Sequence, residues 1–314
     1  MSEYDVRIVD LWQKRSDNGG QKQEGQDGEE PSFVMIGCPV DEGVIRNSGR
    51  PGASLAPPLI RKYFQKMTPP ADMWETFAAF VRKGRDLGDI PQAGMEEMQE
   101  ELASRVAPWI SGKVPVIVLG GGHETTYGHF LAYRIAKQSH HILNIDAHCD
   151  VRPLKNGQGH SGSPFRQILE EEDSLCRSYH VMGLQPQSVA REHLEFIRSK
   201  GGEAEFADRA GIGCISDRLG KLTQGRDDGS GVLLTLDMDA VDQSDAPGVS
   251  APNVSGLPKS ILLETARMAG ENSRVMSMDL VEVNPYFDRD DQTSRLGALV
   301  VWYFLLGLCH RNGS

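Results

Sequence analysis

The chain has 314 residues, of which 39% are hydrophobic and 25% charged, the composition of an ordinary globular protein. Its 33 Lys and Arg residues against 44 Asp and Glu residues give a net charge of −11, which excludes an extended nucleic-acid or anionic-membrane surface and favours a small-molecule partner. The N-terminus lacks the pattern of a signal peptide, and five scattered cysteines are typical of reduced thiols, so we expect a cytoplasmic protein without disulfides.

At this length a single domain over residues 1–314 can contain the whole hydrophobic core. Residues 14–32 are polar and lack an apolar period, which predicts a mobile surface segment. Short apolar runs predict strands, and helix-length segments separate them; the strands are expected at 33–37, 114–119, 141–145, 180–183, 232–236 and 275–281. This alternation predicts an α/β fold with a mostly parallel central sheet and helices on both faces. The apolar stretch 296–309 is too short to span a bilayer, which predicts a buried helix.

Two segments place acidic or imidazole side chains at alternate positions directly after an apolar run. Asp146, His148 and Asp150 follow the run at 141–145, and Asp237 and Asp239 follow the run at 232–236. Because alternate residues of a strand share one face, the side chains of each segment can converge near the strand end. Ligand sites in open α/β sheets lie at that edge, so position and chemistry agree.

A further imidazole, His123, follows the run at 114–119 and three glycines, which brings the set to four carboxylates and two imidazoles. This mixture of oxygen and nitrogen donors suits manganese better than a thiolate zinc site. Four aspartates carry −4, so two dications would neutralise them. At the ~3.5 Å spacing of two-metal sites, two dications repel by roughly 19 kcal/mol at an effective dielectric of ~20, and bridging carboxylates must offset that repulsion. Unrelated solvated side chains are the alternative, which the recurrence of the pattern disfavours.

These residues also carry a family resemblance. In chain order, the segments that resemble the ureohydrolase superfamily of arginases, agmatinases and formimidoylglutamases are Gly120–Glu124, Asn144–Asp150, Leu236–Asp242 and Val281–Pro285. The resemblance implies a three-layer α/β/α arginase-like fold and a binuclear manganese hydrolase that cleaves a C–N bond of an amidine or guanidine group. It also implies a homo-oligomer, usually a trimer or hexamer.

The resemblance further implies how two Mn²⁺ ions are held. One ion would be bound by His123, Asp146, Asp150 and Asp237. The other would be bound by Asp146, His148, Asp237 and Asp239. Asp146 and Asp237 would then bridge the two ions.

Catalytic and substrate-binding roles follow from the same resemblance. Asp239 would accept a proton from the attacking water and orient it, and Glu282 would hold the positively charged amidine. His160 would lie beside the substrate as a proton shuttle, because imidazole titrates near neutrality. Arg152 and Asn156 would join Glu282 and His160 in contacting the substrate. The alternatives are an exposed strand-end acid at Glu282 and a loop histidine without a role at His160.

Two loops separate the branches of the superfamily. Two residues after Asp150, arginases carry an asparagine, whereas this chain carries Arg152, whose planar charged fork suits a carboxylate. Arginases also carry an acid that meets an α-ammonium group, and Ser188 stands at that position here. These loops resemble formimidoylglutamases, which implies hydrolysis of N-formimidoyl-L-glutamate to L-glutamate and formamide in histidine degradation.

Two other functions stay open at this stage. A guanidino-acid hydrolase of the guanidinobutyrase, agmatinase or arginase type would release urea, and guanidinobutyrate also offers a carboxylate. A non-catalytic pseudoenzyme could keep the fold as an oligomeric interaction module. The six intact ligand positions disfavour the pseudoenzyme.

Overall fold

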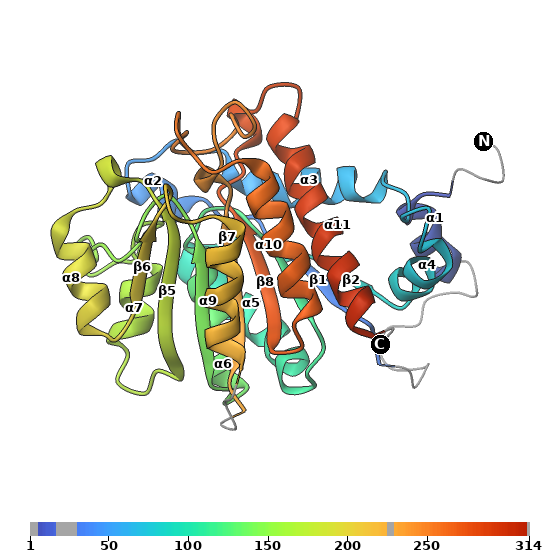
Figure 1. The fold of residues 1–314 in the computed structure, drawn as a ribbon, viewed down its shortest axis with the longest axis horizontal. Helices are drawn as coiled ribbons and strands as arrows, with labels where there is room; N and C mark the ends of the chain where they lie inside the picture. Colours follow the sequence, from blue (N-terminus) through green and yellow to red (C-terminus); the bar gives the residue numbers. More distant parts are fainter. Residues whose placement is uncertain (1–5, 17–29, 225–228, 313–314) are drawn as a thin grey trace.

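An eight-stranded sheet, with all its strands parallel, forms the centre of the computed structural model, which describes residues 6–16, 30–224 and 229–312. The strand order is β2-β1-β3-β8-β7-β4-β5-β6, and the sheet runs from β6 at the left of Figure 1 to β2 at the right. The strands are β1 (Val34–Cys38), β2 (Arg85–Asp89), β3 (Val116–Gly120), β4 (His140–Ile145), β5 (Cys176–Leu184), β6 (Glu203–Phe206), β7 (Gly231–Asp237) and β8 (Val275–Val281).

Helices cover both faces of the sheet, which confirms the predicted three-layer α/β/α fold (Figure 1). One face is covered by α3 (Ala56–Gln65), α4 (Trp74–Arg82), α9 (Ile212–Thr223), α10 (Lys259–Glu271) and α11 (Gln292–Asn312). The other is covered by α5 (Met95–Ser111), α6 (Thr125–Ile135), α7 (Pro164–Glu170) and α8 (Arg191–Ser199). Successive residues of a strand enter opposite cores: in β3, Ile117 and Leu119 pack into the first core and Val116 and Val118 into the second.

The two edge strands are absent from the sequence prediction. β2 and β6 are short and rich in charged residues, so neither contains the apolar run that marks an interior strand. Residues 17–29 of the predicted mobile segment lie outside the described residues. At its two ends, residues 14–16 complete α1 (Ile8–Ser16), and the Ser32 hydroxyl donates to the carbonyl oxygen of Phe80 at 2.6 Å. The predicted mobility of the segment stays a prediction.

The apolar stretch near the C-terminus forms α11, which has 21 residues. By length and composition this helix is long enough and apolar enough to cross a membrane, so the prediction that the apolar stretch is too short to span a bilayer was wrong. Its packing nevertheless agrees with a buried helix, because 67% of that apolar window is buried inside the protein. Gly307 of α11 and Gly270 of α10 allow close approach of the helices: a β-carbon at Gly307 would lie 2.1 Å from the Arg267 carbonyl oxygen.

The chain order places the site at the centre of one sheet edge. After β3 the chain crosses to β4, and it returns later to insert β7 and β8 between these two strands. The carboxyl ends of β3, β8, β7 and β4 therefore lie next to one another, at the point where the direction of strand addition changes. Ligand sites of open α/β sheets form at such a point.

Candidate metal centre and substrate cavity

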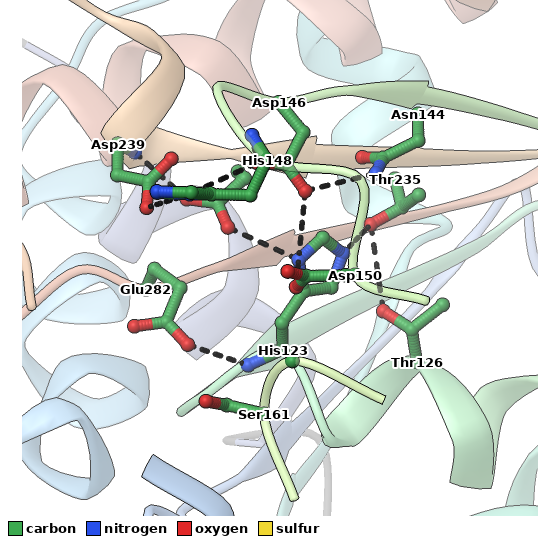
Figure 2. Close-up of polar contacts among 12 residues, drawn as sticks. His123, Thr126, Asn144, Asp146, His148, Asp150, Ser161, Thr235, Asp239 and Glu282 are labelled. Carbon is green, nitrogen blue, oxygen red and sulfur yellow. Dashed lines mark hydrogen bonds and ion pairs between the residues drawn. The ribbon is translucent and has the colours of Figure 1, made fainter. Parts of the chain in front are cut away.

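A first cluster forms around the His123 ring, which follows β3 (Figure 2). Its Nδ1 atom lies 3.0 Å from Asp237 Oδ2, 3.1 Å from Asp150 Oδ2 and 3.3 Å from Asp146 Oδ2. One ligand atom from each of the four residues lies within 4.8 Å of the others, as a shared cation requires. The structure therefore brings together the four residues predicted for the first ion.

A second cluster shares Asp146 with the first. The Nδ1 atom of His148 lies 3.1 Å from Asp239 Oδ2 and 3.6 Å from Asp146 Oδ1, and these three residues could hold another cation. Asp146 is thus placed to bridge two ions. Asp237 belongs only to the first cluster in this geometry, so its predicted bridging role stays a prediction.

Turns after the strands, not the strands themselves, make the ligands converge. β4 ends at Ile145 and β7 ends at Asp237. The two strands pair in parallel with Ile145 opposite Leu236, so their carboxyl ends lie side by side. The His148 N–H donates to Asp146 Oδ1 at 2.7 Å, and the Asp239 N–H donates to Asp237 Oδ1 at 2.8 Å. In each segment the leading aspartate therefore closes a turn onto the residue two positions later. The predicted convergence holds, but strand alternation was the wrong reason for it.

Thr235 of β7 contacts the other nitrogen of the His123 ring. The His123 Nε2 and Thr235 Oγ1 atoms are 3.0 Å apart, and the Thr126 hydroxyl lies 3.4 Å from Thr235 Oγ1 (Figure 2). If Nε2 carries the proton and donates it to Thr235, Nδ1 keeps its lone pair. That buried Nδ1 has no hydrogen-bond partner among the described residues, and neither has the buried Oδ1 of Asp239. Both unpartnered atoms are ones that a cation would satisfy.

The buried carboxylates of the clusters favour positive charge next to them, as the pKa shifts of their members indicate. Burial, together with the nearby charges of Asp239 and Asp146, raises the pKa of Asp237 well above its ordinary value. Burial opposes a charged His123 ring, but the surrounding carboxylates still hold its pKa well above the usual range. The charge of Asp239 does the same for the pKa of His148. Because the donors are carboxylate oxygens and imidazole nitrogens with no thiolate, the clusters fit two hard or borderline divalent cations.

A cavity of about 180 Å³ lies over the two clusters. Its walls come from the loops after β1, β4, β7 and β8, and its lining residues are Val44, Asn47, Ser48, Gly49, His148, Asp150, Arg152, Ser161, Asp237, Asp239, Ser250, Ala251 and Glu282. A larger cavity of about 650 Å³ borders α4, the start of β3 and the end of α11, and contains none of the predicted site residues. The smaller cavity is therefore the candidate substrate site.

Glu282 forms one wall of this cavity directly after β8. Its backbone has a φ of 64°, a left-handed conformation that is uncommon outside glycine. The backbone N–H of Glu282 donates to the Gly121 carbonyl oxygen at 2.8 Å, and its Oε1 atom accepts from the His123 N–H at 2.8 Å. Burial and the charge of Asp239 raise the pKa of its carboxyl to about 7. These bonds hold the strained residue in place beside the metal clusters.

Arg152 and Asn156, the other residues predicted to contact the substrate, lie in the loop after β4. Arg152 lines the cavity and is exposed at its mouth. Asn156 does not line the cavity but lies at the exposed tip of a turn closed by two hydrogen bonds between Lys155 and Gln158, so its predicted substrate contact stays a prediction. The pair Asn156-Gly157, with positive φ at both residues, is a typical tight-turn sequence, and this signal was available in the sequence.

His160 is buried next to the cavity wall, with both ring nitrogens engaged by backbone groups. Its Nε2 lies 3.0 Å from the Pro153 carbonyl oxygen, and its Nδ1 accepts from the Gly162 N–H at 3.1 Å. A proton shuttle needs a ring nitrogen directed at the substrate, and this arrangement provides none. The shuttle role of His160 therefore stays a prediction that these two contacts do not support.

Sequence reasoning also missed several polar residues of the site. Asn47, Ser161 and Ser250 line the cavity, but they are common loop residues whose spacing marks no motif. Glu124 is buried behind it, where its Oε1 accepts from the Gly43 N–H at 2.8 Å and burial raises its pKa to about 8. This bond ties the loop after β1 to the segment that carries His123.

Cys149 lies between two ligand residues in the sequence, and alternation predicts that it points away from them. It is 2% exposed and packs in the hydrophobic core on the α5 side of the sheet. Burial raises the pKa of its thiol to about 12. The structure therefore agrees with a packed thiol and gives Cys149 no place in the clusters.

Comparison with known proteins gives the family. Residues 31–307 match the Arginase family. The chain belongs to the arginase family. This arginase-family chain is 35% identical over 274 residues to a formimidoylglutamase of Geobacillus thermodenitrificans (strain NG80-2), which covers 86% of this chain and 82% of that protein.

Two solved structures resemble the arginase-family fold of this chain along nearly its whole length. A formiminoglutamase of Trypanosoma cruzi, solved with Mn²⁺, gives a TM-score of 0.84 at 28% identity and covers 98% of this chain and 99% of that chain. A formimidoylglutamase of Bacillus subtilis gives a TM-score of 0.84 at 25% identity and covers 98% of this chain and 94% of that chain. The shared fold extends the match beyond the motif segments.

Proposed function

We propose that this arginase-family protein is a formimidoylglutamase, which hydrolyses N-formimidoyl-L-glutamate to L-glutamate and formamide. The observation that carries the proposal is the composition of the cavity: its floor is the pair of cation-demanding clusters, and its mouth carries Arg152. Among the described residues that line the cavity, Arg152 is the only lysine or arginine. The similarity to formimidoylglutamases over most of the chain supports the same activity.

The cofactor that we propose is a pair of Mn²⁺ ions. His123, Asp146, Asp150 and Asp237 would hold one ion, and Asp146, His148 and Asp239 the other. When bound, the ions supply positive charge that makes water a nucleophile near neutral pH. The donor set and the Mn²⁺ in the Trypanosoma cruzi protein support this choice of metal.

The side chains around the clusters divide the remaining work. The Glu282 carboxylate faces the cavity beside His123, where it can bind the amidinium nitrogens and concentrate positive charge on the formimidoyl carbon. The unpartnered Oδ1 atom of Asp239 can accept a proton from the attacking water and orient it. Arg152 can bind a carboxylate of the glutamate portion through its planar fork.

The cavity does not favour agmatine or arginine. Agmatine ends in an ammonium group, which Arg152 at the mouth would repel. Arginine carries an α-carboxylate that Arg152 could bind, but its α-ammonium group would lie beside the same positive charge. Ser188, where an arginase carries an acid, lies in a short 3₁₀ helix (Pro186–Ser188) and does not line the cavity. Glutamate derivatives offer two carboxylates and no free ammonium, which matches an arginine present and an acid absent.

We further propose that the protein acts in the cytoplasm as a homo-oligomer, a trimer or hexamer. All five cysteines are free thiols, as expected in a reducing compartment. Light scattering coupled to size-exclusion chromatography tests the assembly, and a monomer at micromolar concentration would contradict it.

A comparison of substrates tests the activity. We expect manganese-loaded protein to release formamide from N-formimidoyl-L-glutamate, with much slower urea release from 4-guanidinobutanoate and slower still from agmatine. All three compounds present an amidine or guanidine carbon to the cavity floor. The first comparison therefore tests mainly the preference for an amidine over a guanidine, and the second tests the preference for a carboxylate over an ammonium group. Efficient urea release without formamide release would replace the proposed function by the guanidino-acid alternative.

A further inference from the structure

Arg152 reaches the cavity from a loop, yet its neighbours hold it at two points. Its backbone N–H donates to the Gly162 carbonyl oxygen at 2.8 Å, and its Nη1 atom donates to Asn47 Oδ1 at 3.1 Å. Gly162 makes room for both partners, because a β-carbon there would lie 3.1 Å from Arg152 Cδ and 3.0 Å from Asn47 Nδ2. Two hydrogen bonds and a glycine without a side chain therefore set the position of the Arg152 side chain.

Asn47 joins two loops of the cavity wall. It follows α2 (Glu42–Arg46), and its Nδ2 atom donates to Ser161 Oγ at 3.1 Å while its Oδ1 atom accepts from Arg152. These two bonds fix which end of the amide faces the guanidinium, because only the oxygen can accept from an arginine. Asn47, Ser161 and Arg152 all line the cavity.

His160 holds the backbone on both sides of this contact. Its Nε2–H donates to the carbonyl oxygen of Pro153, the residue after Arg152, at 3.0 Å. Its Nδ1 accepts from the N–H of Gly162, whose carbonyl oxygen accepts from Arg152, at 3.1 Å. One neutral tautomer satisfies both bonds, and burial lowers the pKa of the ring, which favours that neutral form. His160 thus connects the two backbone segments between which Arg152 lies.

We propose that Asn47 and His160 are positioning residues that aim the Arg152 guanidinium at a substrate carboxylate. Four residues form this Arg152 cradle: Asn47, His160, Ser161 and Gly162. A free arginine side chain samples many rotamers, so a cradle that fixes it before binding raises the affinity for a carboxylate. The inference rests on the proposed function and assigns His160 to substrate selection instead of proton transfer.

The test measures a ratio of two substrates. N-formimidoyl-L-glutamate carries carboxylates and N-butylformamidine carries none, while both present the same formimidoyl group. The ratio of their kcat/KM values reports carboxylate recognition alone, since damage to the metal centre lowers both. Manganese content and Tm are measured for every variant.

Asn47 variants should change the ratio through KM. Asn47→Ala removes the acceptor, and we expect the ratio to fall about threefold to tenfold, the size of one hydrogen bond. Asn47→Asp places a carboxylate against the guanidinium and neutralises it, so the ratio should fall by roughly tenfold or more. Ser161→Ala, which removes only the support of Asn47, is the matched control with the smaller effect.

His160 variants separate positioning from proton transfer. The glutamine amide can both donate and accept a hydrogen bond but does not titrate, so His160→Gln should retain most of the parent ratio, and His160→Ala should lower it. If His160 transferred protons, glutamine would fail to rescue, and kcat on both substrates would fall together by ~10²-fold. That result, or an unchanged ratio in both Asn47 variants, overturns the proposal.

The same variants keep the inference separate from the proposed function. If the parent protein releases urea but no formamide, the proposed function fails, and the ratio is measured with 4-guanidinobutanoate against butylguanidine. If it hydrolyses neither pair, the affinity of the manganese-loaded protein for L-glutamate decides. Parent binding that Asn47→Asp weakens by roughly tenfold supports the cradle; no binding to the parent, or equal binding, overturns it.

Discussion

The floor and the mouth of the cavity are built in different ways. On the floor, the side chains of Asp146, Asp237 and Glu282 each accept a backbone N–H, and all three residues are buried at the ends of central strands. At the mouth, the guanidinium of Arg152 is exposed and is held by the side chain of Asn47. The proposed hydrolytic chemistry therefore lies directly at the ends of the central strands, and the proposed selection of substrate lies on loops farther from the sheet.

Substitution of the candidate metal ligands on the cavity floor should lower activity the most. Asp237→Asn should release metal and lower activity by more than ~10²-fold. Substitution of a residue that only supports a metal ligand already lowers metal affinity or activity by up to about 100-fold. Asp239→Asn should retain more metal if Asp237 bridges both ions, as the family resemblance implies, because Asp239 belongs only to the second cluster. Metal analysis of the dialysed proteins checks the order. Equal metal content in both variants would contradict a special role for Asp237.

A smaller effect is expected at the mouth. Arg152→Ala should lower kcat/KM for N-formimidoyl-L-glutamate by about 10-fold to 100-fold, the range for losing a charged hydrogen bond. The lower part of the range is favoured because the guanidinium is solvent-exposed before substrate binds. Steady-state kinetics with metal analysis measure this. Manganese content should match the parent, and its loss would mean that floor and mouth are not separable; Arg152→Lys is the control that retains the charge.

Thr235 offers a finer test of the floor. Thr235→Val should weaken manganese binding about tenfold, because the buried Nε2–H of His123 loses its acceptor. Thr235→Ser restores the hydroxyl and should recover most of the affinity. Isothermal titration calorimetry with Mn²⁺ measures the affinity of both variants. Thr126→Val removes the hydroxyl that lies 3.4 Å from Thr235 Oγ1 and should have less effect. Equal weakening by Thr235→Ser and Thr235→Val would contradict a proton on His123 Nε2 that Thr235 accepts.

The smallest effect on activity is expected for Cys149, which lies between two candidate ligands in the sequence but packs in the hydrophobic core. Cys149→Ala should lower the free energy of unfolding by about 1 kcal/mol while leaving kcat within about twofold at saturating metal, because the thiol only packs. Urea denaturation and steady-state kinetics check the two halves. A kcat loss of ~10²-fold with metal retained would instead make the thiol a chemical group.

The same division explains what the sequence could predict. Interior strands such as β3 and β8 contain apolar runs, whereas β2 and β6 contain too few apolar residues to show one. The ligands were found because acidic and imidazole residues directly after apolar runs are unusual, even though turns rather than strand alternation bring them together. Asn47 escaped detection, since its partners Arg152 and Ser161 are 105 and 114 residues away in the sequence.

Anomalous X-ray diffraction from crystals grown with Mn²⁺ would show whether the two clusters hold two manganese ions. We expect two manganese peaks per chain, one next to Nδ1 of His123 and one next to Nδ1 of His148, with Asp146 in contact with both ions. A single peak, or ions bound away from these two imidazoles, would contradict this expectation.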